Sequence, residues 1–348
     1  MEWYKETYEE SRQAFLDLAN ASGGEIHSHK VPGQFESDLS FETLYFPPVS
    51  GNKERLLILT SGIHGIEGFT GSALQRYFMA SNFFNLKDEK TGILIIHGIN
   101  PFGFKHEKRV TESNVDLNRN FDISEELFRL ENPGYAELYP FLNPKRPYSK
   151  FSFYRSAIFY ILKYGMDSLR KAILRGQYQF PDGIFFGGKS FEPQVSLVKN
   201  EVTKIGEGYE KVLLIDLHTG YGKRGKLHLL GDRSPFIDQQ YMNDVFREHS
   251  VDYGQKKDFY AVTGGLTVFM AKLFYGKAKF AGIVFEFGTI DSHKPLGSLD
   301  SLYRIVNADQ DKEAFREMFY PRSLKWRKTV LEQFQGTLEK AVRNWTDW

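Results

Sequence analysis

Two short motifs in the sequence carry side chains of the kinds that bind metal ions. In the first, His64 and Glu67 lie three residues apart, and the second is Asp216-Leu217-His218. Either motif alone could arise by chance, and His218 could equally be a strand-end histidine that makes a hydrogen bond. Two histidines and one glutamate together match a catalytic zinc site, which keeps a fourth position open for water. With no cysteine in the chain, thiolate ligands and disulfides are excluded.

Three further positions could act on a substrate. Asn118 and Arg119 stand in the run from 115 to 122, and a guanidinium can grip a carboxylate with two hydrogen bonds; the alternative is a solvated turn. Upstream, Arg109 could stabilise a carbonyl oxygen that becomes negative during a reaction. Glu286 ends an apolar run among aromatic residues, so it needs a partner or a role. It is either half of a salt bridge or a general base acting on metal-bound water.

In this order, the residues resemble the zinc metallocarboxypeptidase family of the carboxypeptidase A type, over roughly residues 55–290. The resemblance implies one zinc ion held by His64, Glu67 and His218, with Glu286 as the base. It also implies that Asp116 orients the first zinc ligand from behind.

The same resemblance implies how a substrate is held. Asn118 and Arg119 would bind its terminal carboxylate, and Arg109 would polarise the scissile carbonyl. Tyr260, four residues before a Gly-Gly pair, would close over the substrate. The three residues after that pair, 266–268, would shape the pocket for the last side chain, and their types favour apolar or small residues.

Two departures from the digestive carboxypeptidases leave the substrate open. Ile66 stands where those enzymes have an arginine. The sequence around Ile66 is closer to that of the succinylglutamate desuccinylase and aspartoacylase relatives, which cleave N-acyl amino acids. In addition, 98 residues separate Arg119 from His218, which predicts an insertion that reshapes the pocket. The partner is therefore a peptide or an N-acyl amino acid with a free carboxylate. A non-catalytic carboxylate- or peptide-binding protein is a weaker alternative, because every ligand and the base are present.

Four short apolar runs would position these residues, and we expect them to be strands buried on both faces. They lie at 55–60, 92–97, 212–216 and 281–286. A helix expected at 68–84 joins the first two as a parallel crossover, and the resulting fold is a three-layer α/β/α structure with a mixed, largely buried central sheet. Ligands bind where the strands of such a sheet end.

We expect one catalytic domain over 1–348. Outside the four runs we expect a helix, two strands, a helical segment and a final helix, at 4–20, 25–29, 39–46, 153–175 and 323–342. Residues 1–50 would then form an N-terminal helix and strands, and 124–209 an insertion within the domain.

Composition narrows the classes of partner. The net charge is +1 and the basic residues are scattered, so nucleic acid is not an expected partner. No apolar run approaches the roughly 18 residues that a membrane span needs. The polar, acidic N-terminus lacks the pattern of a secretory signal. We therefore expect a cytoplasmic hydrolase, with no membrane partner.

Overall fold

The computed structural model describes residues 2–33, 36, 38–81, 89–253 and 263–346. Its centre is one eight-stranded sheet with the strand order β1-β2-β4-β3-β5-β8-β6-β7. The strands are β1 (Glu25–Lys30), β2 (Ser40–Phe46), β3 (Arg55–Ser61), β4 (Thr91–His97), β5 (Lys211–Gly220), β6 (Leu227–Gly231), β7 (Val251–Asp252) and β8 (Lys279–Gly288).

The four strands β4, β3, β5 and β8 run parallel to one another in the middle of the sheet. On one side β2 pairs antiparallel with β4, and on the other β6 pairs antiparallel with β8. Almost every residue of the four central strands is buried, as the apolar runs predict. The carboxyl ends of these strands therefore meet at one edge of the sheet.

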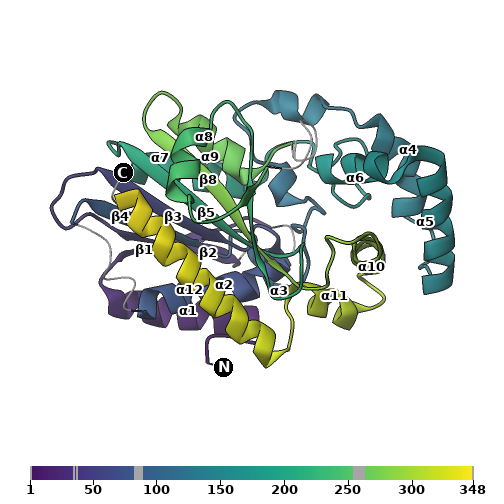
Figure 1. The fold of residues 1–348 in the computed structure, drawn as a ribbon, viewed down its shortest axis with the longest axis horizontal. Coiled ribbons are helices and arrows are strands. Elements are labelled where there is room, and N and C mark those ends of the chain that lie inside the picture. The colour runs from purple at the N-terminus through teal and green to yellow at the C-terminus, as the bar shows by residue number, and fades with distance from the viewer. Residues whose placement is uncertain (1, 34–35, 37, 82–88, 254–262, 347–348) are drawn as a thin grey trace.

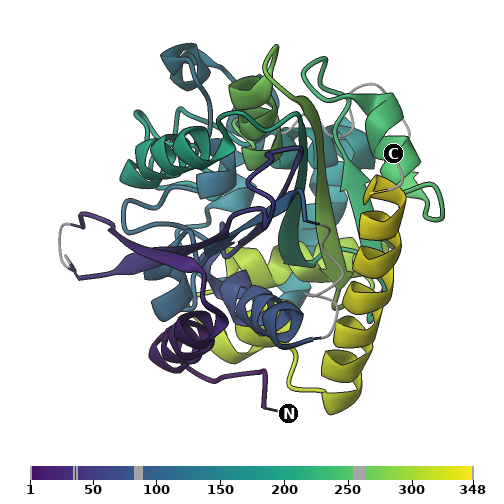
Figure 2. The same ribbon diagram turned by 90° about the vertical axis from the view of Figure 1, so that its left-hand side faces the viewer.

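Helices cover both faces of the sheet. They are α1 (Tyr8–Ser22), α2 (Gly68–Ala80), α3 (Pro101–Lys105), α4 (Pro133–Leu142), α5 (Lys150–Tyr164), α6 (Met166–Arg175), α7 (Pro193–Gly206), α8 (Gln239–Val245), α9 (Leu266–Phe274), α10 (Pro295–Val306), α11 (Lys312–Phe319) and α12 (Leu324–Thr346). Three short 3₁₀ helices accompany them: η1 (Gly65–Glu67), η3 (Leu117–Arg119) and η4 (Glu125–Arg129). In Figures 1 and 2, α1, α2 and α12 lie on one side of the sheet and α7 and α9 on the other. The expected three-layer α/β/α fold with a mixed central sheet is confirmed.

A buried amide fixes α2 against the strand ends. Gln75 of α2 donates hydrogen bonds to the carbonyl oxygens of Leu59 and Ile96, both at 3.0 Å, and accepts one from Ser61 at 2.9 Å. A buried polar group must be satisfied in this way, because leaving it unpaired costs about 1–3 kcal/mol. The crossover from β3 through α2 to β4 is thereby held in register where β3 ends.

Most expected elements are present with shifted ends, but the helical segment expected near 153–175 is two helices. The break falls at Gly165, whose φ is 82° and ψ 152°, a backbone conformation that a side-chain-bearing residue rarely adopts. Its amide closes α5 by donating to the carbonyl of Ile161 at 2.8 Å, and α6 begins at the next residue. The residues around the glycine are helix formers, so local pattern alone did not reveal the break.

The segment 124–209 divides between two hydrophobic clusters. Val195, Val198 and Val202 of α7 belong to the main cluster around the sheet. Helices α4, α5 and α6 instead form a second cluster together with α10, which contributes Leu299 and Leu302. These four helices lie at the right of Figure 1, beyond the end of the sheet. None of the helices in the described ranges is long and apolar enough to cross a membrane.

Truncating a side chain in the central strand should destabilise the whole chain. Leu214 of β5 is fully buried between β3 and β8. We expect Leu214→Ala to lower the free energy of unfolding by about 2–5 kcal/mol, because it leaves a cavity in the sheet's core. Urea denaturation measures this loss. Val49→Ala, at a position 76% exposed, is the matched control and should change stability by less than about 0.5 kcal/mol; equal losses in both variants would contradict the placement of β5.

Candidate active site

The three predicted metal ligands meet at the carboxyl ends of β3 and β5. His64 follows the end of β3 and precedes η1, Glu67 ends η1, and His218 lies in β5 beside β3. One ligand atom from each residue lies within 4.8 Å of the others, and all three residues are buried. The turn requires Gly65, because a Cβ there would lie 2.0 Å from the carbonyl carbon of Gly103.

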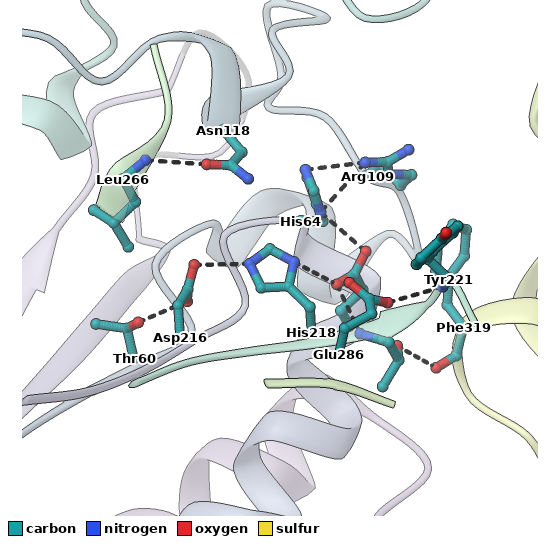
Figure 3. A network of polar contacts seen from close by, with 12 residues as sticks. Thr60, His64, Arg109, Asn118, Asp216, His218, Tyr221, Leu266, Glu286 and Phe319 are labelled. Atoms are coloured by element: carbon teal, nitrogen blue, oxygen red, sulfur yellow. Dashed lines mark hydrogen bonds and ion pairs between the residues drawn. The ribbon is translucent and has the colours of Figure 1, made fainter. Parts of the chain in front are cut away.

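Each histidine contacts Glu67 through its Nδ1 atom and an aspartate on the opposite side of the ring through its Nε2 atom. Nδ1 of His64 and Nδ1 of His218 each lie 3.0 Å from an oxygen of Glu67. On the far side, Nε2 of His64 lies 3.1 Å from Asp116, and Nε2 of His218 lies 2.7 Å from Asp216. Figure 3 shows the chain of contacts from His218 to Asp216 and on to Thr60, whose hydroxyl donates to that carboxylate at 2.6 Å.

This arrangement fits a divalent metal ion. Metal-binding histidines usually give their second nitrogen to a carboxylate, which fixes the ring's orientation and tautomer. Here both rings have such a partner, and the remaining nitrogens converge with a carboxylate. The set of two imidazoles and one carboxylate suits zinc, with a position left for water.

The acids of the cluster are stabilised as anions. Burial raises the pKa of Glu67, but His64 and His218 lower it further, so the net pKa lies well below its ordinary value. For Asp116, burial likewise raises the pKa, and His64 and Arg119 lower it by more. Burial lowers the pKa of His218, yet Asp216 and Glu67 raise it well above the ordinary value. The cluster is thus a buried site whose acids favour the anionic form, which suits the binding of a cation.

The pKa of Glu286 is shifted in the opposite direction, above its ordinary value. Glu286 lies in β8 directly opposite His218 of β5 and is buried. Burial, and then the charge of Glu67, raise its pKa to about 8, although His218 and the backbone amide of Tyr221 act against this. That amide donates to Oε1 of Glu286 at 2.8 Å (Figure 3). A carboxyl group that gains and loses a proton near neutral pH is suited to general acid–base chemistry.

Arg109 reaches the same point from the loop after α3. Its Nη2 lies 3.0 Å and 3.3 Å from the two ring nitrogens of His64. The guanidinium sits between the rings of Phe185 and Phe319, with its central carbon 5.6 Å and 5.5 Å from the ring centres. The two rings limit where the cation can move, so its charge is directed at the metal-ligand cluster.

Asn118 and Arg119 also line the site. The side-chain oxygen of Asn118 accepts from the amide of Leu266 at 3.1 Å, and Arg119 donates to the carbonyl of Asn118 at 2.9 Å. Arg119 is buried, and its Nε has no hydrogen-bond partner among the described residues. A buried cation with an unused donor can bind an anion that enters the site.

A cavity of about 300 Å³ joins these groups. Its walls include His64, Glu67, His218, Glu286, Arg109, Asn118 and Arg119. Asp116 stands behind His64 and does not line the cavity, whereas Thr267 and Val268 do. Tyr260, the remaining expected site residue, lies outside the described residues. His97 is fully buried against the ring of Phe15, with 4.2 Å between ring centres, and does not line the cavity.

The sequence analysis singled out Asp216 with His218 but gave Asp216 no role. In the structure it orients His218, and their spacing of two residues along a strand puts both on one face. Helix α6 also forms part of the cavity wall through Met166, Leu169 and Arg170. No local pattern points to this feature, although the expected reshaping of the pocket by an insertion agrees with it.

Comparisons with known proteins agree on the fold. A family model described as "Protein of unknown function (DUF2817)" matches residues 4–333, and no curated protein matches the sequence. The structure of thrombin-activatable fibrinolysis inhibitor is similar with a TM-score of 0.53 and 12% identity, over 98% of this chain and 74% of that one. The bovine inhibitor in complex with a tick carboxypeptidase inhibitor gives 0.48 and 14%, over 97% and 98%. Carboxypeptidase A from Helicoverpa armigera gives 0.45 and 14%, over 88% and 75%. The chain thus has a carboxypeptidase-like α/β fold, and the relation to succinylglutamate desuccinylase stays a prediction.

Removing the carboxylate behind His218 should weaken metal binding without removing a ligand. We expect Asp216→Ala to lower zinc affinity by about 10- to 100-fold, because the imidazole loses the partner that fixes its orientation. Competition with a chromogenic chelator measures the affinity. Asp182→Ala, at an exposed position outside the cavity, is the control and should bind zinc like the unaltered protein. Unchanged affinity in Asp216→Ala would show that His218 needs no such support.

Proposed function

This chain belongs to the DUF2817 family, and from its site we propose that it is a zinc-dependent hydrolase, a carboxypeptidase that removes C-terminal residues from peptides. One observation carries the proposal. Two imidazoles and a carboxylate converge within 4.8 Å, and the cavity that they line also contains Glu286, Arg109 and the Asn118–Arg119 pair. No other group of three or more histidine or acidic side chains in the described ranges has this geometry.

Different residues of the chain would bind the metal ion and transfer the proton. His64, Glu67 and His218 would hold the zinc ion. When bound, zinc would lower the pKa of a water molecule towards about 7 and polarise the scissile carbonyl. Glu286 accepts the proton of the attacking water and returns it to the leaving amine nitrogen.

Arg109, Asn118 and Arg119 supply the fixed positive charge and hydrogen-bond donors. Arg109 stabilises the carbonyl oxygen as it gains negative charge, an effect whose removal typically costs on the order of 3 kcal/mol. Asn118 and Arg119 hold the free carboxylate of the residue beyond the scissile bond. Because the carboxylate is bound at a fixed distance from the reacting carbonyl, cleavage is confined to the end of a chain.

An N-acyl amino acid amidohydrolase is the second candidate, with the same zinc site and base. The observation in its favour is the apolar wall that Leu169, Ile173 and Leu174 of α6 add to the cavity. Such a wall could receive an acyl group in place of a peptide. Both reactions need a free carboxylate on the leaving amino acid, so they differ only in what lies on the other side of the scissile bond.

Replacing the base should separate metal binding from catalysis. We expect Glu286→Gln to retain zinc but lose about 10²- to 10⁴-fold in kcat, because the amide cannot accept the proton of water. His64→Ala should lose both zinc and activity. Metal analysis and initial rates on the same preparations give the two readouts. Turnover like that of the unaltered enzyme in Glu286→Gln would remove Glu286 from the mechanism.

Substrate panels should separate the two candidates and test the carboxylate contact. For whichever substrate is cleaved, blocking its carboxylate as an amide or ester should lower kcat/KM by roughly 10- to 100-fold, since Arg119 loses a charged partner. Cleavage of C-terminal residues from peptides but not of N-acyl amino acids supports the carboxypeptidase, and the reverse supports the amidohydrolase. Equal cleavage of free and blocked substrates would contradict the role of Asn118 and Arg119.

A further inference from the structure

Helix α5 carries an apolar face that nothing in the described chain covers. Phe151, Ile158, Phe159 and Leu162 are 79%, 55%, 58% and 82% exposed. Their spacing places all four on one side of a helix. Four of the nine exposed large hydrophobic residues of the described chain are thus gathered on this one helix of 15 residues. Contiguous exposed apolar surface of this kind marks an interaction site.

The opposite side of α5 packs α5 against the neighbouring helices. Phe153 and Ala157 are fully buried in the second hydrophobic cluster. Phe153 packs on Phe141 of α4 at 5.3 Å between ring centres and on Tyr303 of α10 at the same distance. None of the outer four residues belongs to this cluster, so their apolar character needs another explanation.

Helix α5 and the residues just before it are rich in cations although the whole chain is nearly neutral. Residues 145–163 contain five lysines and arginines and no acid, whereas the net charge of the chain is +1. All five cations are exposed. The nearest acids are on neighbouring helices: Glu137 of α4 acts on Lys163, and Asp300 of α10 acts on Tyr154. Arg155 lies within the apolar face itself, and its long aliphatic stem can extend along an apolar surface while the guanidinium remains in a polar layer.

We propose that the outer face of α5 docks on the surface of a membrane that contains anionic phospholipid. Apolar side chains flanked by cations are what a helix needs to lie in the boundary between headgroups and acyl chains. Each lysine or arginine near an anionic leaflet adds attraction of its own. A second copy of this chain is a poorer partner, because two such faces would bring like charges together. The absence of an apolar run long enough to span a bilayer, which led us to expect no membrane partner, does not bear on surface docking.

The position of the helix suits this role. In Figure 1, α5 forms the end of the molecule farthest from the sheet, so it can meet a flat surface without obstruction by the main body. Only Gly165 separates it from α6, which lines the cavity. Docking through α5 would therefore bring the cavity's α6 wall close to the lipid headgroups.

Flotation of the full chain with phospholipid vesicles tests the proposal without any substrate. The vesicles are phosphatidylcholine alone, or equal parts of phosphatidylcholine and phosphatidylglycerol. We expect binding to the second and little to the first, and weaker binding as salt is raised, because salt screens the cations. No binding to phosphatidylglycerol vesicles at low salt overturns the proposal, as does equal binding to both kinds.

Two surface variants identify the face responsible. Phe151→Ser combined with Leu162→Ser should reduce the fraction bound by about tenfold or more, because two large side chains no longer enter the bilayer. Leu324→Ser, at a position 62% exposed on α12, is the matched control and should bind like the unaltered chain. Equal binding by the double variant overturns the proposal. So does sedimentation analysis that shows a dimer lost in the double variant while vesicle binding is unchanged, since the face would then join two copies.

Discussion

The structure depends on one buried carboxylate, that of Glu67, which both His64 and His218 contact at 3.0 Å. A charge in this position has lost most of its hydration, so its partners must be complete and well oriented. Completeness requires that β3 and β5 be parallel neighbours, since His64 lies in the turn after β3 and His218 lies in β5. It also requires a second carboxylate behind each ring. The layered fold is the frame that brings these separate pieces of chain within hydrogen-bonding distance.

The acids of the site serve different purposes because their surroundings differ. Glu67 lies between two imidazoles that keep its pKa low, whereas Glu286 faces burial and a neighbouring negative charge, which raise its pKa to about 8. These two environments are adjacent, since β8 places Glu286 opposite His218, which itself contacts Glu67. Opposed pKa shifts of this kind are typical of sites that bind a cation and transfer protons at once.

Helices α4, α5 and α6 are packed apart from the central sheet. They form a separate hydrophobic cluster with α10, and α6 closes one side of the cavity. Substrate selection and the proposed contact with lipid would both depend on this group of helices, while the proposed metal ligands and base lie in β5, in β8 and in the turn after β3. The two sets of properties can therefore vary independently, because their side chains pack in different clusters.

The sequence by itself predicted the strands and the residues that would bind a metal. Short apolar runs and the spacings of His64 with Glu67 and of Asp216 with His218 are local patterns, and local geometry follows from them directly. The roles expected of Asp116 and Arg109 came from the family resemblance. Only the tertiary structure shows that both reach the imidazole of His64, through segments whose paths no periodicity describes. The wall formed by α6 is likewise a result of packing between helices, which depends on contacts between residues far apart in the chain.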